Sequence, residues 1–414
     1  MRIKITLILL IVFFRALAQN PKVVIDSTAI TIKEFKNASL LDSLLQKNFF
    51  DTNDIISNDS TSIVHDMFVH TDTLKKRLDN LNSRTPLDIT YNSVIENLIN
   101  NYLRKRRSSF NKLFNRAEYY FPLFEEVFDK SGIPLEIKYL AIVESALRPN
   151  VRSKAGASGL WQFMFSTARL FDLEVNSYID DRFNPLKSTN AAAQYLQKLY
   201  DTFGDWNLSL AAYNAGPGNV TKAIRRSGGY TNYWNIRPFL PAETANYIPK
   251  FIAILYIFEY AEEHGFSSSK LYPSVINTDT VKIKRMVHFD HIKEILNVDI
   301  EMLRFYNPSY KLDIIPVFDG KESLLRLPIA MVGTFISNEA EIYAYSKAEF
   351  DKREKPLPKF YTMDSKIRYK VKSGDYLGKI AKKYNVTTEE IIRWNSLKSD
   401  LINIGDKLII YIKN

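Results

Sequence analysis

The sequence predicts a mainly α-helical domain followed by small modules with the element order strand, helix, helix, strand. Apolar residues recur at helical spacing through residues 135–147, 189–200 and 208–215, which predicts helices that pack against one another. Residues 278–330 and 367–414 each begin and end with a short strand pattern that flanks two short helical patterns. A length of 414 residues exceeds one ordinary domain and allows two or three.

The N-terminal segment is expected to be processed rather than folded. Residues 1–18 have the pattern of a secretory signal peptide, with basic residues, an apolar run and Ala16-Leu17-Ala18 as a cleavage site. The apolar run is too short to span a bilayer comfortably, so we expect removal rather than anchoring. Residues 19–88 are rich in Asp, Asn, Ser and Thr, which predicts a partly ordered arm.

Within residues 89–270, Glu144 stands where a charge is unexpected. At helical spacing it falls in line with Ile137, Leu140 and Leu147, a stripe that should face the interior. Burial disfavours the charged form of a carboxyl, so we expect its pKa to rise from about 4.3 toward neutrality. A proton held near pH 7 is what a general acid needs. A buried Glu paired with an Arg or Lys is the alternative, because buried charges are usually paired.

Downstream segments supply side chains that suit a sugar-binding cleft beside this acid. The small residues of 155–159 are followed by an aromatic residue and an amide, so a ligand can approach the backbone closely. The run 208–218 predicts a helix that ends on Asn214 or Gly216, since Pro217 blocks its continuation. Aromatic faces stack on pyranose rings, while amides and hydroxyls bind the ring substituents.

At these positions the sequence resembles the soluble lytic transglycosylase (SLT) domain, a goose-lysozyme-like α-helical domain that cleaves peptidoglycan glycan strands. The match covers roughly residues 100–265, and residues 182, 185 and 243–251 look most like the murein lytic transglycosylases of the D type. Many relatives carry Met where this chain has Trp161, so we expect a bulkier wall at one sugar subsite. The four motifs, in order, are Glu144-Ser145, Gly159-Leu160-Trp161-Gln162, Ala212-Tyr213-Asn214-Ala215-Gly216 and Tyr247.

The resemblance implies a mechanism with one carboxyl. Glu144 would donate a proton to the β-1,4 bond between N-acetylmuramic acid and N-acetylglucosamine, then act as a base while a 1,6-anhydro sugar forms. Tyr247 would orient Glu144, and Ser145 would help to place it or a sugar substituent. The implied substrate-binding residues are Ser145, Gly159, Leu160, Trp161, Gln162, Tyr213, Asn214 and Tyr247.

Other readings stay open from the sequence alone. Most glycosidases use two carboxylates, and Asp180, Asp181 and Asp205 are candidates for a second one. The first two look like turn residues and Asp205 like a helix cap. A hydrolytic muramidase, a chitin-degrading enzyme and an inactive wall-binding scaffold are therefore alternatives.

Residues 367–414 resemble a LysM domain, a non-catalytic module that holds glycans containing N-acetylglucosamine. Tyr376 replaces the usual Thr or Ser, which keeps a hydroxyl but changes its reach. A structural cap without sugar binding is the alternative. The implied glycan-binding residues are Gly374, Asp375, Tyr376, Leu377, Asp400, Leu401 and Ile402.

Residues 278–330 repeat this order of elements without the Gly-Asp turn. We interpret them as a degenerate LysM-like module, with Asn307 in the place of Asn395, that packs against the catalytic domain rather than binding glycan. An unrelated α+β extension is the alternative. Residues 331–366 predict a helix and a charged, proline-containing linker.

Composition limits the cofactors, partners and location. The chain contains no Cys, so we expect no lipid attachment through Cys and no disulfide, and its five scattered His residues suggest no metal site. The net charge is +10, and removal of residues 1–18 takes away three basic residues and no acid, leaving +7. The basic run 104–107 lies on a helical pattern from 91 to 110, where a solvated face is expected rather than nucleic-acid binding. We expect no cofactor, peptidoglycan strands as the partner, and an exported protein of the periplasm or cell envelope without a membrane anchor.

Overall fold

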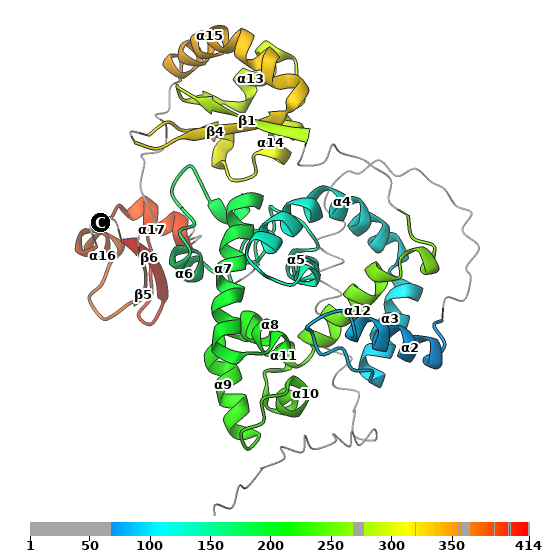
Figure 1. Cartoon of the computed structure of the whole chain (residues 1–414). Coiled ribbons are helices and arrows are strands. Elements are labelled where there is room, and N and C mark those ends of the chain that lie inside the picture. Colours follow the sequence, from blue (N-terminus) through cyan, green and yellow to red (C-terminus); the bar gives the residue numbers. More distant parts are fainter. Residues whose placement is uncertain are drawn as a thin grey trace, which may run out of the picture.

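The computed structural model describes residues 68–153, 155–267, 277–318, 320–353, 357, 365–384, 386–395, 397 and 399–412. The predicted signal peptide and most of the predicted arm therefore lie outside the described residues. The mainly α-helical fold class is confirmed, and Figure 1 shows a large helical domain with two small modules that contain strands. No helix in these ranges is long and apolar enough to cross a membrane.

The helical domain is built around α12, which is buried on nearly every side. Its sequence YIPKFIAILYIFE is almost wholly apolar, and it packs against α3, α5 and α8. Helix α2 packs its buried Leu74, Leu78 and Leu81 into the same core, so this part of the predicted arm is ordered. The α-helices are α2 (Thr71–Asn82), α3 (Ser93–Lys105), α4 (Arg107–Lys130), α5 (Leu140–Ser145), α6 (Phe165–Leu170), α7 (Pro185–Phe203), α8 (Trp206–Ala215), α9 (Pro217–Arg226), α10 (Tyr233–Ile236), α11 (Ala242–Ala245) and α12 (Tyr247–Glu259). Short 3₁₀ turns are η1 (Leu135–Tyr139), η2 (Asp181–Phe183), η3 (Arg237–Phe239) and η4 (Glu262–His264).

Local sequence sets where the helices near the site begin and end. Asn184 accepts a hydrogen bond from the N–H of Lys187, and Pro185 occupies the first turn of α7. Asp205 caps α8 in the same way, as expected. Helix α8 ends at Ala215, between the two predicted positions, with Gly216 as its C-cap, and Pro217 begins α9 directly.

One helix prediction was wrong. The pattern from 91 to 110 is divided between α3 and α4, because Arg106 leaves the helical conformation at φ −126° and ψ 17°. The guanidinium of Arg107 then donates to the carbonyl oxygens of His264 and Gly265. Arg107 of the basic run therefore joins the start of α4 to the segment after α12, instead of facing only solvent.

The two modules with strands share one hydrogen-bond pattern. Asn307 donates to the carbonyls of Leu303 and Arg326 and accepts from the N–H of Arg326. Asn395 makes the same three bonds with Ile391 and Ile409. The predicted correspondence of the two asparagines is thus confirmed.

Each module closes with an antiparallel strand pair. The first contains β1 (Thr278–Ile283), β2 (Val287–His288), α13 (Phe289–Leu296), α14 (Ile300–Tyr306), η6 (Lys311–Asp313), β3 (Ile314–Ile315), β4 (Ser323–Pro328) and α15 (Ile329–Asp351), with β1 paired to β4 and β2 to β3. The second contains β5 (Ser365–Lys370), α16 (Leu377–Lys383), α17 (Thr388–Asn395) and β6 (Lys407–Ile412), with β5 paired to β6. Thr387 and Glu390 form a reciprocal capping box at the start of α17.

Candidate active site

Glu144 lies in the last turn of α5, at the edge of the core. Ile137, Leu140 and Ala141 are fully buried, as predicted, whereas Glu144 is only partly exposed. The helix ends abruptly because Ala146 (φ 53°) and Leu147 (φ 56°) adopt the left-handed conformation. For residues with a side chain this conformation costs about 1–2 kcal/mol each. The fold therefore accepts backbone strain where it presents this carboxyl.

The surroundings of Glu144 favour its neutral form. Burial raises its pKa from 4.5 to about 7, against a hydrogen bond from Tyr247 that lowers it, while the charge of Glu243 adds to the rise. The Tyr247 hydroxyl donates to Oε1 of Glu144. Burial also raises the pKa of Tyr213 and of Tyr247 well above 10, so both phenols stay protonated. Among the described residues no Lys or Arg forms an ion pair with Glu144, which removes the alternative of a paired structural charge.

Gln162 belongs to a tight hairpin that accepts a hydrogen bond from Tyr213 through the backbone oxygen of Trp161. It has a left-handed backbone (φ 47°), and its amide nitrogen donates to the carbonyls of Gly159 (2.8 Å) and Val151 (3.2 Å). Ser158 and Phe163 exchange both backbone hydrogen bonds across the hairpin. Both hydrogen bonds of the amide nitrogen therefore go to backbone carbonyls, and they fix the orientation of the Gln162 side chain.

Three residues of the same motif do not line a cleft as expected. Trp161 and Leu160 are fully buried, and the indole nitrogen of Trp161 donates to the Thr189 hydroxyl at 3.0 Å. The predicted bulky wall at a sugar subsite is therefore wrong, because this ring packs inside the core. A Cβ on Gly159 would lie 1.8 Å from the carbonyl oxygen of Arg182. This glycine thus permits a close approach of the backbone, not of a ligand.

The remaining candidates lie on α5 and α8, and the side chain of each is hydrogen-bonded within the protein. The Tyr213 hydroxyl donates to the backbone oxygen of Trp161 at 2.8 Å. Asn214 Oδ1 accepts from the Thr244 hydroxyl at 2.7 Å. Ser145 is buried and donates to the carbonyl of Ala141, so its hydroxyl serves α5 itself. Thr244 was missed from the sequence, although it lies three residues before Tyr247.

The three other acids have structural partners. Asp180 is fully buried, and Arg182 donates to it from Nε (2.9 Å) and Nη2 (2.8 Å). Asp181 pairs with Lys187 at 2.9 Å. Asp205 caps α8. Each of these carboxylates is therefore held by a cation or a helix end and away from the role of a second catalytic acid.

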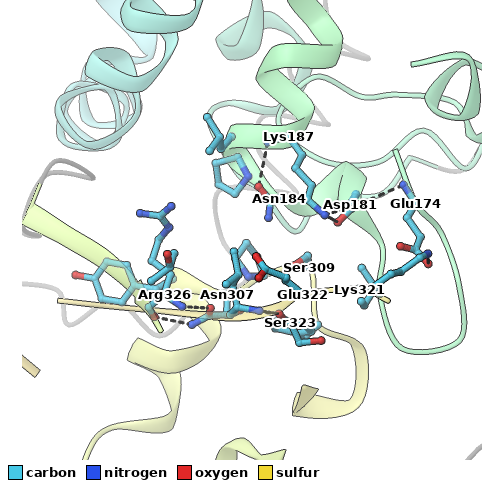
Figure 2. Close-up of a pocket in the computed structure, with 18 of the residues that line it drawn as sticks. Glu174, Asp181, Asn184, Lys187, Asn307, Ser309, Lys321, Glu322, Ser323 and Arg326 are labelled. Carbon is cyan, nitrogen blue, oxygen red and sulfur yellow. Dashed lines mark hydrogen bonds and ion pairs between the residues drawn. The ribbon is translucent and has the colours of Figure 1, made fainter. Parts of the chain in front are cut away.

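Two further observations limit the chemistry. The cavity in Figure 2, of about 210 Å³, lies between the segment from Glu174 to Lys187 and the module that contains Asn307 and Arg326, and Glu144 is not among its lining residues. No cluster of three or more potential metal ligands occurs in the part of the chain that the structure describes. The site as built offers acid–base chemistry by Glu144 and hydrogen bonds from neutral groups.

The predicted glycan-binding residues of the terminal module fall into two groups. Tyr376 and Leu401 are 65% and 83% exposed. Leu377 is buried in the module core, so its side chain does not face a ligand, contrary to expectation. Asp375 accepts from the Tyr369 hydroxyl and the Lys372 N–H, which makes it a turn-forming residue. Gly374 has φ 79° in the same turn, and Asp400 and Ile402 lie beside Leu401 in the opposite loop.

Comparison with known proteins assigns all three folded parts. Residues 123–235 match the Transglycosylase SLT domain family, residues 277–344 the LysM-like domain of lytic transglycosylase MltD, and residues 369–410 the LysM domain family. The chain is 28% identical over 374 residues to the membrane-bound lytic murein transglycosylase D of Escherichia coli, with 76% of this chain and 80% of the relative covered. The chain thus combines an SLT domain, an MltD-type LysM-like domain and a LysM domain, and it is similar to the lytic murein transglycosylases of the D type.

Other relatives match a smaller part. The soluble lytic murein transglycosylase of Escherichia coli is 34% identical over 154 residues, which cover 34% of this chain and 24% of the relative. The crystal structure of the 70 kDa soluble lytic transglycosylase of Escherichia coli is 25% identical, with a TM-score of 0.33. That match covers 49% of this chain and a third of the solved chain.

Proposed function

We propose that this peptidoglycan lytic transglycosylase cleaves the β-1,4 bond between N-acetylmuramic acid and N-acetylglucosamine, with Glu144 as its single acid and base. The observation that carries the proposal is a partly exposed carboxyl whose pKa is raised to about 7 and whose hydrogen-bond partner is a neutral phenol. Near neutral pH such a group is present in both protonation states, so it can give a proton and take one back.

The reaction proceeds in two proton transfers. Protonated Glu144 donates to the glycosidic oxygen as the bond to C1 of the muramyl sugar breaks, and the N-acetylglucosamine unit leaves with a free 4-hydroxyl. The N-acetyl group of the substrate stabilises the positive charge at C1, one of the exceptions to the two-carboxylate scheme. Glu144, now ionised, takes the proton of the muramyl C6 hydroxyl, and O6 bonds to C1. Water is not consumed, and the product is a 1,6-anhydro sugar.

The residues around Glu144 suit these two proton transfers. Tyr247 keeps its proton and directs it at one carboxyl oxygen, which leaves the other oxygen for the substrate. Gln162, in its hairpin, and Asn214, at the end of α8, would hold the N-acetyl and hydroxyl groups of the substrate. The carboxylates of Asp180 and Asp181 are each held by a cation, so a one-carboxyl mechanism needs no further acid.

Mass spectrometry of the soluble products released from purified sacculi tests the reaction. Anhydromuropeptides support transglycosylation. Reducing muropeptides would replace it by hydrolysis, and the absence of soluble products would support a wall-binding scaffold. Glu144→Gln as a matched control must remove the product, whatever its end group, if the acid is correctly placed.

The terminal LysM domain acts in this proposal as a tether for glycans that contain N-acetylglucosamine. Exposed Tyr376 and Leu401 stand on its two predicted binding loops and offer a ring face and an apolar contact. A tether raises the local concentration of the enzyme on an insoluble polymer without changing the catalytic site. Deletion of Lys366 to Asn414 should weaken sacculus pull-down and preserve activity on short soluble strands. Unchanged pull-down would reject the tether.

Export completes the proposal. Residues 1–18 would be removed, and the enzyme would act in the periplasm or cell envelope. N-terminal sequencing of the protein from the envelope fraction should begin at Gln19; a sequence that begins at Met1 would show that the segment is retained.

A further inference from the structure

The first LysM-like module contacts the catalytic domain through its α14–β4 loop, residues 307–322. The corresponding loop of the terminal LysM domain, residues 396–406, carries the exposed Leu401 and Ile404. In the first module the loop forms backbone hydrogen bonds with the segment 174–181 instead. The contacts are an antiparallel bridge between Ile179 and Tyr310, a bond from Asp180 N–H to Ser309 O (2.9 Å), one from Lys311 N–H to Tyr178 O (2.7 Å), and one from Lys311 Nζ to Asn176 O (2.5 Å).

Side chains extend this interface on both flanks. Lys321 forms an ion pair with Glu174 at 2.9 Å, and both line the cavity shown in Figure 2. On the other flank, the ring of Tyr119 from α4 lies 4.9 Å from Phe305 and 6.2 Å from Tyr306 between centroids. Tyr306 is buried in the core of the catalytic domain. The module is thus joined by backbone hydrogen bonds, by the Lys321–Glu174 ion pair and by shared core packing.

The segment 174–181, to which the module is hydrogen-bonded, is connected through Asp180 and Arg182 to the hairpin that contains Gln162. Asp180, whose N–H is bonded to the module, binds Arg182 through both carboxylate oxygens. Nη1 of Arg182 then donates to the carbonyls of Gly156 (2.9 Å) and Phe163 (3.3 Å), which flank the hairpin. Arg182 is itself buried, so these bonds are shielded from competition by water.

The hairpin is bonded in turn to Tyr213, which lies within the electrostatic reach of Glu144. The backbone oxygen of Trp161 accepts a hydrogen bond from the hydroxyl of Tyr213. Burial raises the pKa of that Tyr213, and the charge of Glu144 adds to the rise. Gln162 is held in its left-handed conformation by the same hairpin. We infer that the LysM-like module is a positioning element of the active site. Its α14–β4 loop fixes the segment 174–181, and Asp180 and Arg182 connect this segment to the hairpin that is bonded to Tyr213. The activity part of this inference rests on the proposed function.

The full-length chain with substitutions at Lys311 tests the inference. Lys311→Ala removes the bond to Asn176, and Lys311→Pro also removes the N–H bond to Tyr178. Lys311 is the first residue of the 3₁₀ turn η6. Proline, which fixes φ near −65°, is tolerated in the first turn of a helix. Lys284→Ala is the matched control. It removes the ion pair between Lys284 and Glu339, which lies within the module and does not touch the catalytic domain's segment 174–181.

Two readouts are expected to move together. Hydrogen exchange followed by mass spectrometry should become faster in residues 156–163 for Lys311→Pro, less so for Lys311→Ala, and not for Lys284→Ala. On short soluble strands kcat should fall about tenfold for Lys311→Pro, below the ~100-fold that a 1 Å misplacement can cost. The pH at which activity is lost should stay unchanged, since Glu144 keeps its surroundings, and exchange in α12 should stay slow if the fold is intact.

Other results would overturn the inference. Unchanged exchange in residues 156–163 would show that the module does not hold the hairpin, whether or not the reaction is the one proposed. Faster exchange with an unchanged kcat would separate docking from catalysis and reject the positioning role. Weaker binding to sacculi with full activity on short strands would make the docked loop a glycan-binding surface instead. If the parent chain releases no anhydro product, the proposed reaction fails while the exchange result still decides the docking.

Discussion

Two carboxyls of the catalytic domain, Glu144 and Asp180, are shielded from water, the first in part and the second fully, and they have different hydrogen-bond partners. Asp180 is fully buried and receives two bonds from the guanidinium of Arg182 and one from Arg152 at 3.4 Å. Glu144 receives one bond from the neutral phenol of Tyr247. A cation fixes the ionised form and makes the residue structural, whereas a neutral donor leaves the carboxyl able to hold a proton. Burial alone therefore does not define a catalytic acid; the partner does.

The largest effect is expected for Glu144→Gln. Loss of a general acid costs about 10²- to 10⁴-fold in rate, and the amide keeps the shape of the side chain. Turnover of sacculi should nearly stop while the circular dichroism spectrum stays the same. Glu243→Gln is the matched control, because Glu243 acts on Glu144 only through its charge, from an exposed position. Wild-type turnover by Glu144→Gln would remove the residue from the mechanism.

Asp180→Asn should instead lower stability. It leaves Arg182 buried without a counter-charge, and removal of one partner of a buried ion pair costs about 3–5 kcal/mol. Urea unfolding measures the loss. Asp181→Asn is the graded comparison and should cost less, since Lys187 is 56% exposed and can return to water. Equal losses for the two variants would contradict the structural role assigned to Asp180.

The dependence of stability on pH should carry the signature of Glu144. Its pKa in the folded chain, about 7, lies above 4.5, so between these values the folded state binds more protons than the unfolded state. The free energy of unfolding contributed by this group is therefore fully present below pH 4.5 and is lost as the pH rises through 7. Relative to Glu144→Gln, the wild type should lose at most about 3 kcal/mol between pH 4.5 and pH 8. Parallel curves for the two proteins in urea unfolding across this range would count against a raised pKa.

Tyr247→Phe should have the smallest effect on the rate, and it should shift the pH profile of activity upward. The phenol lowers the pKa of Glu144, so its removal should raise that pKa and move the loss of activity at high pH upward. The rate at pH 6 should fall by no more than about tenfold, because one hydrogen bond of orientation is lost. Tyr213→Phe loses a bond to a backbone oxygen and should leave the pH profile in place. A downward shift for Tyr247→Phe would invert the role given to the phenol.

The sequence was informative wherever a pattern is local. The apolar stripe around Glu144 predicted both its helix and its raised pKa, because residues three and four apart share a helix face. Helix caps at Asn184, Asp205 and Thr387 needed only neighbouring residues. The strand order of the two modules followed from short alternating runs in the same way.

Packing between segments far apart in the chain could not be predicted from neighbouring residues. The burial of Trp161 depends on Thr189 of α7 and on Phe124 of α4, which lie far along the chain. The need for Gly159 arises from the carbonyl of Arg182, a close approach that only the folded backbone defines. Docking of the first module was expected, but its link to the hairpin through Asp180 and Arg182 rests on hydrogen bonds between residues up to 135 positions apart.

The most direct measurement is the titration of the Glu144 carboxyl itself by difference infrared spectroscopy, wild type against Glu144→Gln. The carbonyl band of a protonated carboxyl should persist at pH 6 and disappear with a midpoint near pH 7, as the raised pKa requires. A midpoint near 4.5, the value of an ordinary glutamate, would leave no proton to donate at neutral pH and would contradict the account.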